Sequence, residues 1–291
     1  MPVLNKGVWT QDETLVHTDI IPTQTTPEAD RYHLYFSLAC PYAHRVNLVI
    51  HYLELGHSIS SSTLDPKMID GWVFSEQYPD PLYNTKKLSD LYLKHKSDFS
   101  GRVVVPVFWD KKEKCIASNT SADLSLELST KWLPLAKFPY ELTPDKLKES
   151  IIQLNQWLIT NINSQVYTVA RSHTQDKYEK ELCKLFASLQ YLDDRLATQR
   201  YLFGEQITLS DFFLFPTLIR FEAVYENLFK CNQKSLVEFQ HLYRYMMDLY
   251  AIEKIKSTVD IEFSKTHYFY SMTELNPTRI IPVGPKLAWQ A

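Results

Sequence analysis

The chain has 291 residues, about twice the length of a typical domain, so we expect two domains. Its 45% hydrophobic and 22% charged residues exclude a disordered chain and a coiled coil, and its apolar runs are too short for an integral membrane protein. The net charge of −3 gives no electrostatic reason to expect nucleic acid or an anionic membrane as a partner.

The four cysteines are widely and irregularly spaced, at Cys40, Cys115, Cys183 and Cys231, which is not typical of a disulfide framework. The amino terminus lacks the apolar core of a signal peptide, so the sequence predicts a cytoplasmic protein with free thiols. The motifs of dinucleotide-binding loops, P-loops and zinc proteases are absent from the sequence, and we expect no metal.

The first regular elements follow a polar, irregular stretch, residues 1–31, that we interpret as an N-terminal arm. Tyr32–Ser37 alternates and is rich in aromatic residues, which predicts a strand. Apolar residues then recur at helical spacing from Tyr42 to Leu55, with Pro41 at the helix start and Gly56 expected to end the helix. Residues 58–63 are predicted to form a second strand.

The next part of the sequence indicates a long loop and then two strands. Residues 65–100 carry several prolines and tyrosines and predict the loop. Arg102–Trp109 is a β-branched run interrupted by Pro106, and because a central strand excludes proline, we expect Pro106 at the start of a strand or in a turn. Residues 111–117 are then predicted to return as the second strand of a hairpin.

The last element of this domain is a helix that Ser118 or Asn119 caps and that runs to about residue 129. The order β-α-β followed by β-β-α predicts an α/β thioredoxin-like domain over residues 32–130. A linker over residues 131–143 contains two prolines.

Residues 144–291 lack strand-like alternation and predict an all-α C-terminal domain. Helical periodicity dominates four segments, Pro144–Ile162, Thr174–Thr198, Thr208–Leu228 and Ser235–Tyr250. Thr208 can cap the third helix, with Asp211 as the reciprocal acid of a capping box. The tail from Ile261 to Ala291 is predicted to pack as extended chain.

Cys40 lies at the predicted junction between strand and helix, in the motif Cys40-Pro-Tyr-Ala43. Free backbone N–H groups and the dipole of the first helical turn favour a thiolate at this position. Because position 43 is alanine, a mixed disulfide formed at Cys40 has to be resolved by an external thiol. The alternative is a buried, inert cysteine. His44, four residues on, is open to three interpretations: a partner of Cys40, half of a metal site, or a polar residue in a helix contact.

Val105-Pro106 is also open to two interpretations. If the peptide bond before the proline is cis, the backbone of Val105 turns outward and can pair with an extended peptide ligand. Otherwise Pro106 is an ordinary proline of an edge strand.

A resemblance emerges from four segments, Tyr32–Arg45, Gly71–Phe74, Gly101–Asp110 and Arg220–Tyr225. A C-terminal signature extends it over Phe229–Asn232, His267-Tyr268, Asn276-Pro277 and Ile281–Pro285. Together these segments are similar to the glutathionyl-hydroquinone reductases, the xi-class glutathione transferases, which are related to the omega class. The resemblance implies the glutathione transferase fold, a homodimer, and the reduction of glutathionyl-hydroquinones by glutathione as co-substrate.

The same resemblance implies roles for individual residues. Cys40 would attack the glutathionyl sulfur, and Tyr167 would donate a proton to the departing ring carbon. Tyr225 and Tyr268 would approach the cysteine sulfur with their hydroxyls and lower its pKa. The implied contacts with glutathione are Trp72, Arg102, Val103, Val104, Val105, Thr120 and Ser121.

One departure from the family concerns the pair Thr120-Ser121, where an acid usually precedes the serine. Loss of the carboxylate removes a charge-assisted partner of the ligand's ammonium group, an interaction of about 1.5–3 kcal/mol. Thr120 thus motivates one rival to the main hypothesis, a non-catalytic binding protein with the same fold. The nearest rival is an omega-like thioltransferase or dehydroascorbate reductase that uses the same cysteine.

Overall fold

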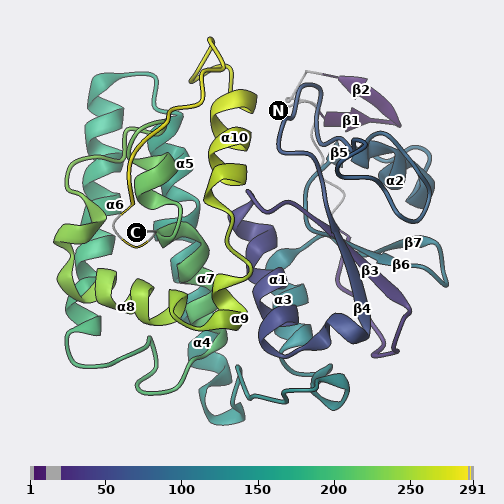
Figure 1. Ribbon diagram of the computed structural model, residues 1–291, viewed down its shortest axis with the longest axis horizontal. Coiled ribbons are helices and arrows are strands. Elements are labelled where there is room, and N and C mark those ends of the chain that lie inside the picture. The colour runs from purple at the N-terminus through teal and green to yellow at the C-terminus, as the bar shows by residue number, and fades with distance from the viewer. Residues whose placement is uncertain (1–2, 11–20, 288, 290–291) are drawn as a thin grey trace. The chain divides into compact units, whose positions relative to one another are not determined.

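The computed structural model describes residues 3–10, 21–287 and 289 (Figure 1). The chain divides into two compact units, Met1–Tyr140 and Glu141–Ala291, and the division falls inside the predicted linker. In the described part of the chain, no helix combines the length and apolar character that crossing a membrane requires.

A four-stranded sheet forms the centre of the first unit, with the strands in the order β4-β3-β6-β7. Its strands are β3 (Tyr32–Phe36), β4 (Ile59–Thr63), β6 (Val107–Asp110) and β7 (Cys115–Ser118). β3 and β4 are parallel, whereas β6 is antiparallel to both β3 and β7. The predicted strands are therefore present. Pro106 lies directly before β6, as we expected because a proline cannot donate a hydrogen bond within a central strand.

Three helices complete this unit: α1 (Pro41–Tyr52), α2 (Leu88–His95) and α3 (Ser121–Leu128). α1 and α3 pack against each other, and α2 contacts β7 (Figure 1). α1 begins with Pro41 at its first position, where the missing N–H costs nothing, and it buries an apolar face that includes Val46 and Val49. This arrangement confirms the predicted α/β thioredoxin-like fold.

Several local predictions in this unit are wrong. α1 ends at Tyr52, and the left-handed residue beyond it is Glu54 (φ 54°), not Gly56, because a short 3₁₀ turn follows there. The predicted loop over residues 65–100 contains α2, whose helical spacing places Leu88 and Tyr92 in the core. The cap of α3 is Thr120, one residue after the predicted choices.

The N-terminal arm is not irregular over residues 3–10. β1 (Val3–Asn5) and β2 (Val8–Thr10) form a hairpin, and β1 also pairs with β5 (Gly101–Arg102). Val3 and Leu4 are buried, so these two apolar residues belong to the core although their neighbours in the sequence are polar. Residues 11–20 of the predicted arm lie outside the described residues.

Residues 21–26 of the arm run along β7 and α3. Gln24 N–H donates to the carbonyl of Ala117 in β7 at 3.0 Å. Thr25 donates its hydroxyl hydrogen to Glu127 of α3 and accepts a hydrogen bond from the Trp132 indole at 3.0 Å. The arm thus covers the β7 edge of the sheet, where an unpaired strand is prone to associate with other chains.

The second unit is all-α, as predicted. Its helices are α4 (Lys148–Leu158), α5 (Gln165–Ala170), α6 (Gln175–Leu196), α7 (Leu209–Leu218), α8 (Gln240–Tyr250), α9 (Glu253–Lys256) and α10 (Ile261–Ser271). α4 continues into a π-helical turn over Ile159–Asn163, and a second π-helical turn, Phe221–Tyr225, follows α7.

The predicted capping box of α7 is confirmed. Asp211 accepts hydrogen bonds from the backbone N–H and the hydroxyl of Thr208, at 2.6 and 3.0 Å. The same carboxylate also accepts from Leu202 N–H and from the Tyr245 hydroxyl. Burial of Asp211 is therefore compensated by four donors, which fix α7 against α8.

The prediction of an extended tail from Ile261 is wrong for its first eleven residues, which form α10. Asp260 caps this helix by accepting from Phe263 N–H at 2.8 Å. Turns follow at residues 273–275 and 277–278, and residues 279–287 form neither helix nor strand. The buried ammonium group of Lys265 on α10 donates to the carbonyl of Val283 at 3.1 Å.

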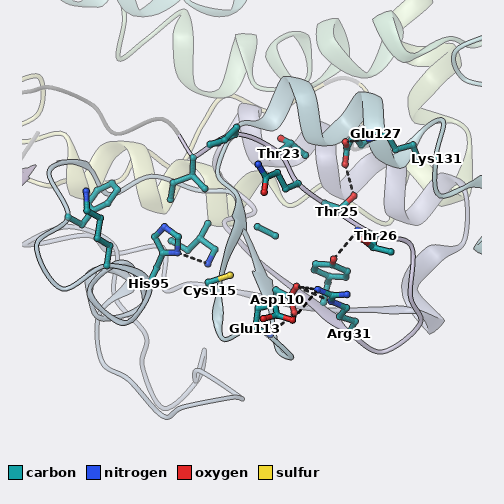
Figure 2. A pocket seen from close by; sticks show the side chains of 18 residues that line it. Thr23, Thr25, Thr26, Arg31, His95, Asp110, Glu113, Cys115, Glu127 and Lys131 are labelled. Atoms are coloured by element: carbon teal, nitrogen blue, oxygen red, sulfur yellow. Dashed lines mark hydrogen bonds and ion pairs between the residues drawn. The ribbon is translucent and has the colours of Figure 1, made fainter.

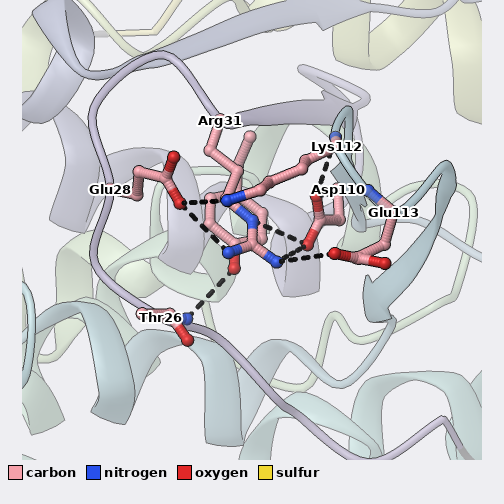
Figure 3. Close-up of polar contacts among 7 residues, drawn as sticks. Thr26, Glu28, Arg31, Asp110, Lys112 and Glu113 are labelled. Carbon is pink, nitrogen blue, oxygen red and sulfur yellow. Dashed lines mark hydrogen bonds and ion pairs between the residues drawn. The ribbon is translucent and has the colours of Figure 1, made fainter.

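An ion pair joins the start of β3 to the end of β6 (Figure 3). Asp110 accepts hydrogen bonds from Arg31 Nε and Nη2 at 2.9 and 2.5 Å, and its other oxygen accepts from the backbone N–H groups of Lys112 and Glu113. Burial opposes ionisation of Asp110, but these donors outweigh it and lower the pKa of the carboxyl group. The ionised form therefore stabilises the sheet and its β6–β7 turn.

The lowered pKa of Asp110 sets the sign of a pH dependence. Its contribution to stability is present above the unfolded-state pKa of about 4 and is lost as the pH falls through the lower folded-state value. We expect Asp110→Asn to lower the free energy of unfolding at pH 7 and to flatten its decline below about pH 4. Urea titrations at several pH values measure both effects. Glu113→Gln is the control, because Glu113 is largely exposed and 3.9 Å from Arg31; equal pH profiles for wild type and Asp110→Asn would contradict the assignment.

Candidate functional site

Cys40 is the N-cap residue of α1, as the sequence predicts. Its backbone is extended (φ −76°, ψ 117°), and its sulfur accepts a hydrogen bond from the backbone N–H of Ala43 at 3.5 Å. The residue is partly exposed. Hydrogen bonding to the sulfur and the positive end of the helix dipole both favour the thiolate over the thiol.

The turn before α1 fixes the position of this sulfur. Cys40 N–H donates to the Ser37 carbonyl at 3.1 Å, and Ala39 N–H donates to the Ser37 hydroxyl at 3.3 Å. Ser37 and Ala39 are fully buried, and Pro41 starts the helix immediately afterwards. The strand-to-helix turn is therefore rigid, and it holds Cys40 at the helix end.

Val105 lies beside Cys40, and the Val105–Pro106 peptide bond is cis. The Val105 carbonyl oxygen is 4.0 Å from the Cys40 sulfur. Among the described residues, the N–H of Val105 makes no hydrogen bond. Of the two interpretations left open by the sequence, the cis form is thus the one observed, and a backbone donor stands next to the candidate nucleophile.

The hydroxyl of Tyr92, on α2, fixes the backbone of Val104, the residue before Val105. It donates to the Val104 carbonyl at 2.9 Å and accepts from Val104 N–H at 3.3 Å and from the Asn119 amide at 3.4 Å. Burial raises the pKa of Tyr92 to about 12, so the hydroxyl stays protonated at neutral pH. Val103, next in this segment, is also buried.

The two remaining predicted contacts of this edge, Trp72 and Arg102, lie on neighbouring segments of the first unit. Trp72 is largely buried, and its carbonyl accepts from Leu88 N–H at the start of α2. Arg102 is exposed at the end of β5. Arg102 precedes Val103–Val105 along the chain, so its backbone is continuous with the edge that carries Val105.

Thr120 and Ser121 lie at the start of α3, Thr120 as the N-cap residue and Ser121 as the first helical residue. The Thr120 hydroxyl shares hydrogen bonds with Thr23 of the arm at 2.9 Å and with Ser118 at 3.3 Å. The position where the family has an acid is therefore tied to the chain's own N-terminal arm. Sequence reasoning missed Thr23, because nothing local marks a contact across such a separation.

Burial disfavours two of the other three thiols as nucleophiles. It raises the pKa of Cys231, which is fully buried in the second unit. It also raises the pKa of Cys115, with the nearby carboxylates of Asp110 and Glu113 acting in the same direction. Cys183 is exposed on α6, away from any helix N-terminus. Among the described residues, no three His, Cys, Asp or Glu side chains gather as a metal site, and His44 is buried.

A hollow of about 880 Å³ lies on the first unit between the arm and the β6–β7 turn (Figure 2). Its charged groups include the pairs Arg31–Asp110 and Lys131–Glu127, and Cys115 is on its wall. None of the predicted glutathione contacts lines it. The hollow is therefore separate from the candidate site at Cys40.

Three predicted tyrosines come together within the second unit, from three different elements. The hydroxyls of Tyr167 on α5 and Tyr268 on α10 are 2.6 Å apart, and the Tyr225 hydroxyl is 3.4 Å from that of Tyr268. Tyr225 and Tyr268 are buried, whereas Tyr167 is partly exposed. Protons can therefore pass from the buried hydroxyls to Tyr167 along a short chain.

Two residues that sequence reasoning did not assign shape this cluster. Phe229 stacks on Tyr225, with ring centroids 5.0 Å apart, and lies edge-on to Tyr268 at 5.7 Å. Burial and the Tyr268 hydroxyl raise the pKa of Tyr225 well above 10, while the charge of buried Arg220 lowers it. The four-residue spacing of Tyr225 and Phe229, one helical turn, is the signal in the sequence that could have identified Phe229.

Comparison with known proteins identifies relatives along nearly the whole chain. Residues 175–246 match the family described as Glutathione S-transferase, C-terminal domain. Glutathionyl-hydroquinone reductase YqjG of Escherichia coli is 39% identical over 268 residues, which cover 90% of this chain and 81% of the relative. Glutathionyl-hydroquinone reductase PcpF of Sphingobium chlorophenolicum is 34% identical over 89% of this chain and 84% of its own.

Solved structures agree with these relatives. The Xi-class glutathione transferase from Natrialba magadii superimposes with a TM-score of 0.96 at 32% identity, covering 100% of this chain and 96% of that one. The glutathione-bound structure of E. coli YqjG has a TM-score of 0.91 at 36% identity, covering 99% and 97%.

Proposed function

Because this chain belongs to the glutathionyl-hydroquinone reductases, the Xi class of glutathione transferases, we propose that it uses glutathione to reduce glutathionyl-hydroquinones to hydroquinones. The observation that carries this proposal is that Cys40 is partly exposed and that its sulfur accepts a hydrogen bond from the Ala43 N–H at the start of α1. A thiolate at this position is the nucleophile that the reaction needs.

In the first half of the reaction, the Cys40 thiolate attacks the sulfur of the glutathionyl group. A disulfide bond forms between Cys40 and glutathione while the carbon–sulfur bond to the ring breaks. The electron pair of that bond remains on the ring carbon, which then takes a proton. The ring is reduced by two electrons, and the two sulfur atoms are oxidised to the disulfide.

In the second half, a second glutathione thiolate attacks the glutathionyl sulfur of the mixed disulfide. Glutathione disulfide leaves, and the Cys40 thiolate is restored. Ala43 stands where some redox proteins of this fold carry a second cysteine, so no internal thiol in the motif competes for this step.

The tyrosine cluster supplies the proton in this proposal. Tyr167 gives its hydroxyl proton to the ring carbon and is reprotonated through the 2.6 Å hydrogen bond with Tyr268. Tyr225 and Tyr268 have the further proposed role of hydrogen-bonding the Cys40 thiolate, as the family resemblance implies. Burial raises the pKa of Tyr225 well above 10, so its hydroxyl remains protonated at neutral pH, which a donor requires.

Glutathione itself is proposed to bind along the edge formed by Trp72 and residues 102–105. Val105 N–H, which has no partner among the described residues, pairs with the ligand backbone as an added strand does. Arg102 and Trp72 contribute a cation and an aromatic face, and Val103 and Val104 line the edge. Thr120 and Ser121 face the γ-glutamyl group, with the N-terminus of α3 favouring its carboxylate.

Two alternatives remain distinct from this proposal. An omega-like thioltransferase or dehydroascorbate reductase would use Cys40 without the tyrosines, and a 33% identical relative in Schizosaccharomyces pombe is named glutathione S-transferase omega-like 2. A non-catalytic binding protein is suggested by Thr120, whose hydroxyl bonds Thr23. Parallel assays with a glutathionyl-hydroquinone and with dehydroascorbate separate the first alternative, and glutathione calorimetry without turnover identifies the second.

We also propose that the protein acts as a homodimer in the cytoplasm and needs no metal. The family resemblance supports the homodimer, and the four free thiols suit a reducing compartment. Sedimentation of the purified protein tests the oligomeric state directly.

Replacement of the nucleophile is the first test of the mechanism. We expect Cys40→Ser to lower turnover of a glutathionyl-hydroquinone at least roughly 1,000-fold while leaving the circular dichroism spectrum unchanged. Cys183→Ser, on the exposed face of α6, is the matched control and keeps full activity. Comparable turnover by Cys40→Ser and wild type would refute the mechanism.

The proton donor is tested by changing the leaving group. Tyr167→Phe should slow reduction of a glutathionyl-hydroquinone roughly 100-fold, because the ring carbon loses its proton donor. A mixed disulfide of glutathione and an alkyl thiol has a thiolate as its leaving group, which needs no proton from Tyr167. Tyr167→Phe should therefore reduce this substrate at the wild-type rate. Tyr191→Phe, half exposed on α6, is the control. An equal slowing with both substrates would remove Tyr167 from the protonation step.

A further inference from the structure

The N-terminal hairpin, β1 and β2, contacts both segments that carry the proposed glutathione contacts of the sheet edge. On one side, β1 pairs with β5, which contains Arg102. On the other side, Trp9 of β2 lies against Gly71, the residue before Trp72. Neither contact was foreseen, since the sequence indicates only an irregular arm here.

The contact with β5 is a built interface. Val3 is opposite Arg102 and Leu4 is opposite Gly101, and among the described strands β1 is the only partner of β5. Lys6 N–H donates to the Ser100 hydroxyl at 2.8 Å. The hairpin therefore sets the backbone of the chain just before residues 103–105.

The hairpin turn fits this segment closely at Gly7. Gly7 N–H donates to the Phe99 carbonyl at 3.0 Å, and its φ of +78° is one that glycine adopts readily. A Cβ at this position would lie 2.3 Å from the Ser97 carbonyl oxygen. The backbones of Gly7 and Ser97 approach too closely for a side chain at position 7. The hairpin therefore packs against residues 97–102 in a single register.

The contact with Gly71 is equally close. A Cβ on Gly71 would lie 2.8 and 2.9 Å from two atoms of the Trp9 indole, so the ring rests directly on the loop backbone. Gly71 has a φ of +88°. Trp72 follows, with its carbonyl bound by Leu88 N–H of α2. The loop is thus fixed by two contacts: the hydrogen bond from Leu88 of α2 to Trp72, and the packing of Trp9 of the hairpin on Gly71.

We propose that the N-terminal hairpin is a positioning element for glutathione, with Trp9 as the positioning residue that acts through Gly71 on Trp72. The proposal rests on the proposed function, because it takes Trp72 and Arg102 as glutathione contacts. Trp9 acts without touching glutathione or the Cys40 sulfur. It keeps the loop in its binding conformation before glutathione arrives, so that less conformational freedom is lost on binding.

The hairpin offers its own matched control. Val8 precedes Trp9 in β2 and, because successive strand residues point to opposite faces, its side chain is 68% exposed. We expect Trp9→Ala to raise the Kd for glutathione, measured by calorimetry, roughly tenfold through misplacement of the loop. KM for glutathione rises in parallel, while kcat and the rate of Cys40 alkylation stay at wild-type values. Val8→Ala leaves every value unchanged.

Trp9→Phe keeps an aromatic ring against Gly71 and should raise the Kd less, roughly threefold. If Trp9→Ala does not fold, this variant carries the test, and a wild-type Kd for Trp9→Phe then overturns the proposal. If the wild type binds glutathione and a folded Trp9→Ala variant binds it with the same Kd, the hairpin proposal alone is overturned. A wild-type protein that binds no glutathione overturns the proposed function and the hairpin proposal together.

Discussion

A single hydrogen bond, from the backbone N–H of Ala43 to the sulfur of Cys40, is the interaction on which the chemistry depends. It exists because the chain turns from β3 into α1 at this residue, which leaves the first N–H groups of the helix without backbone partners. The buried Ser37 and the proline at the helix start make that turn rigid. The backbone of the fold therefore stabilises the thiolate form of Cys40.

The rest of the first unit arranges the proposed glutathione-binding edge around that sulfur. The Val105 carbonyl lies 4.0 Å from it, and the Tyr92 hydroxyl holds Val104 from the side of α2. The hairpin pairs with β5, which contains Arg102, and α2 binds the carbonyl of Trp72. In the second unit, three hydroxyls gather from α5, α10 and a π-helical turn, and the resulting cluster combines buried donors with a partly exposed one. The first unit thus carries the proposed nucleophile and ligand edge, and the second unit carries the proposed proton donors.

The sequence predicted those features that depend on neighbours along the chain. Pro41 after Cys40 marks a helix start, and Thr208 with Asp211 marks another, because both signals act within one helical turn. It did not predict α2 or the hairpin, whose few apolar residues become informative only when they pack against distant segments. The tyrosines were recognised through the family resemblance; nothing local distinguishes Tyr167, Tyr225 or Tyr268 from the other tyrosines, since their meeting depends on the packing of three elements.

The central claim is that Cys40 is ionised at neutral pH, and the pH dependence of its alkylation tests this most directly. Brief treatment of the wild-type protein with iodoacetamide across a pH series, followed by mass spectrometry of each cysteine peptide, gives the rate at Cys40 separately from the other thiols. A midpoint below about pH 7.5, at least about one unit under that of a free cysteine, is the predicted result. A midpoint at or above about pH 8.5, or no reaction at Cys40 while Cys183 is modified, would contradict it.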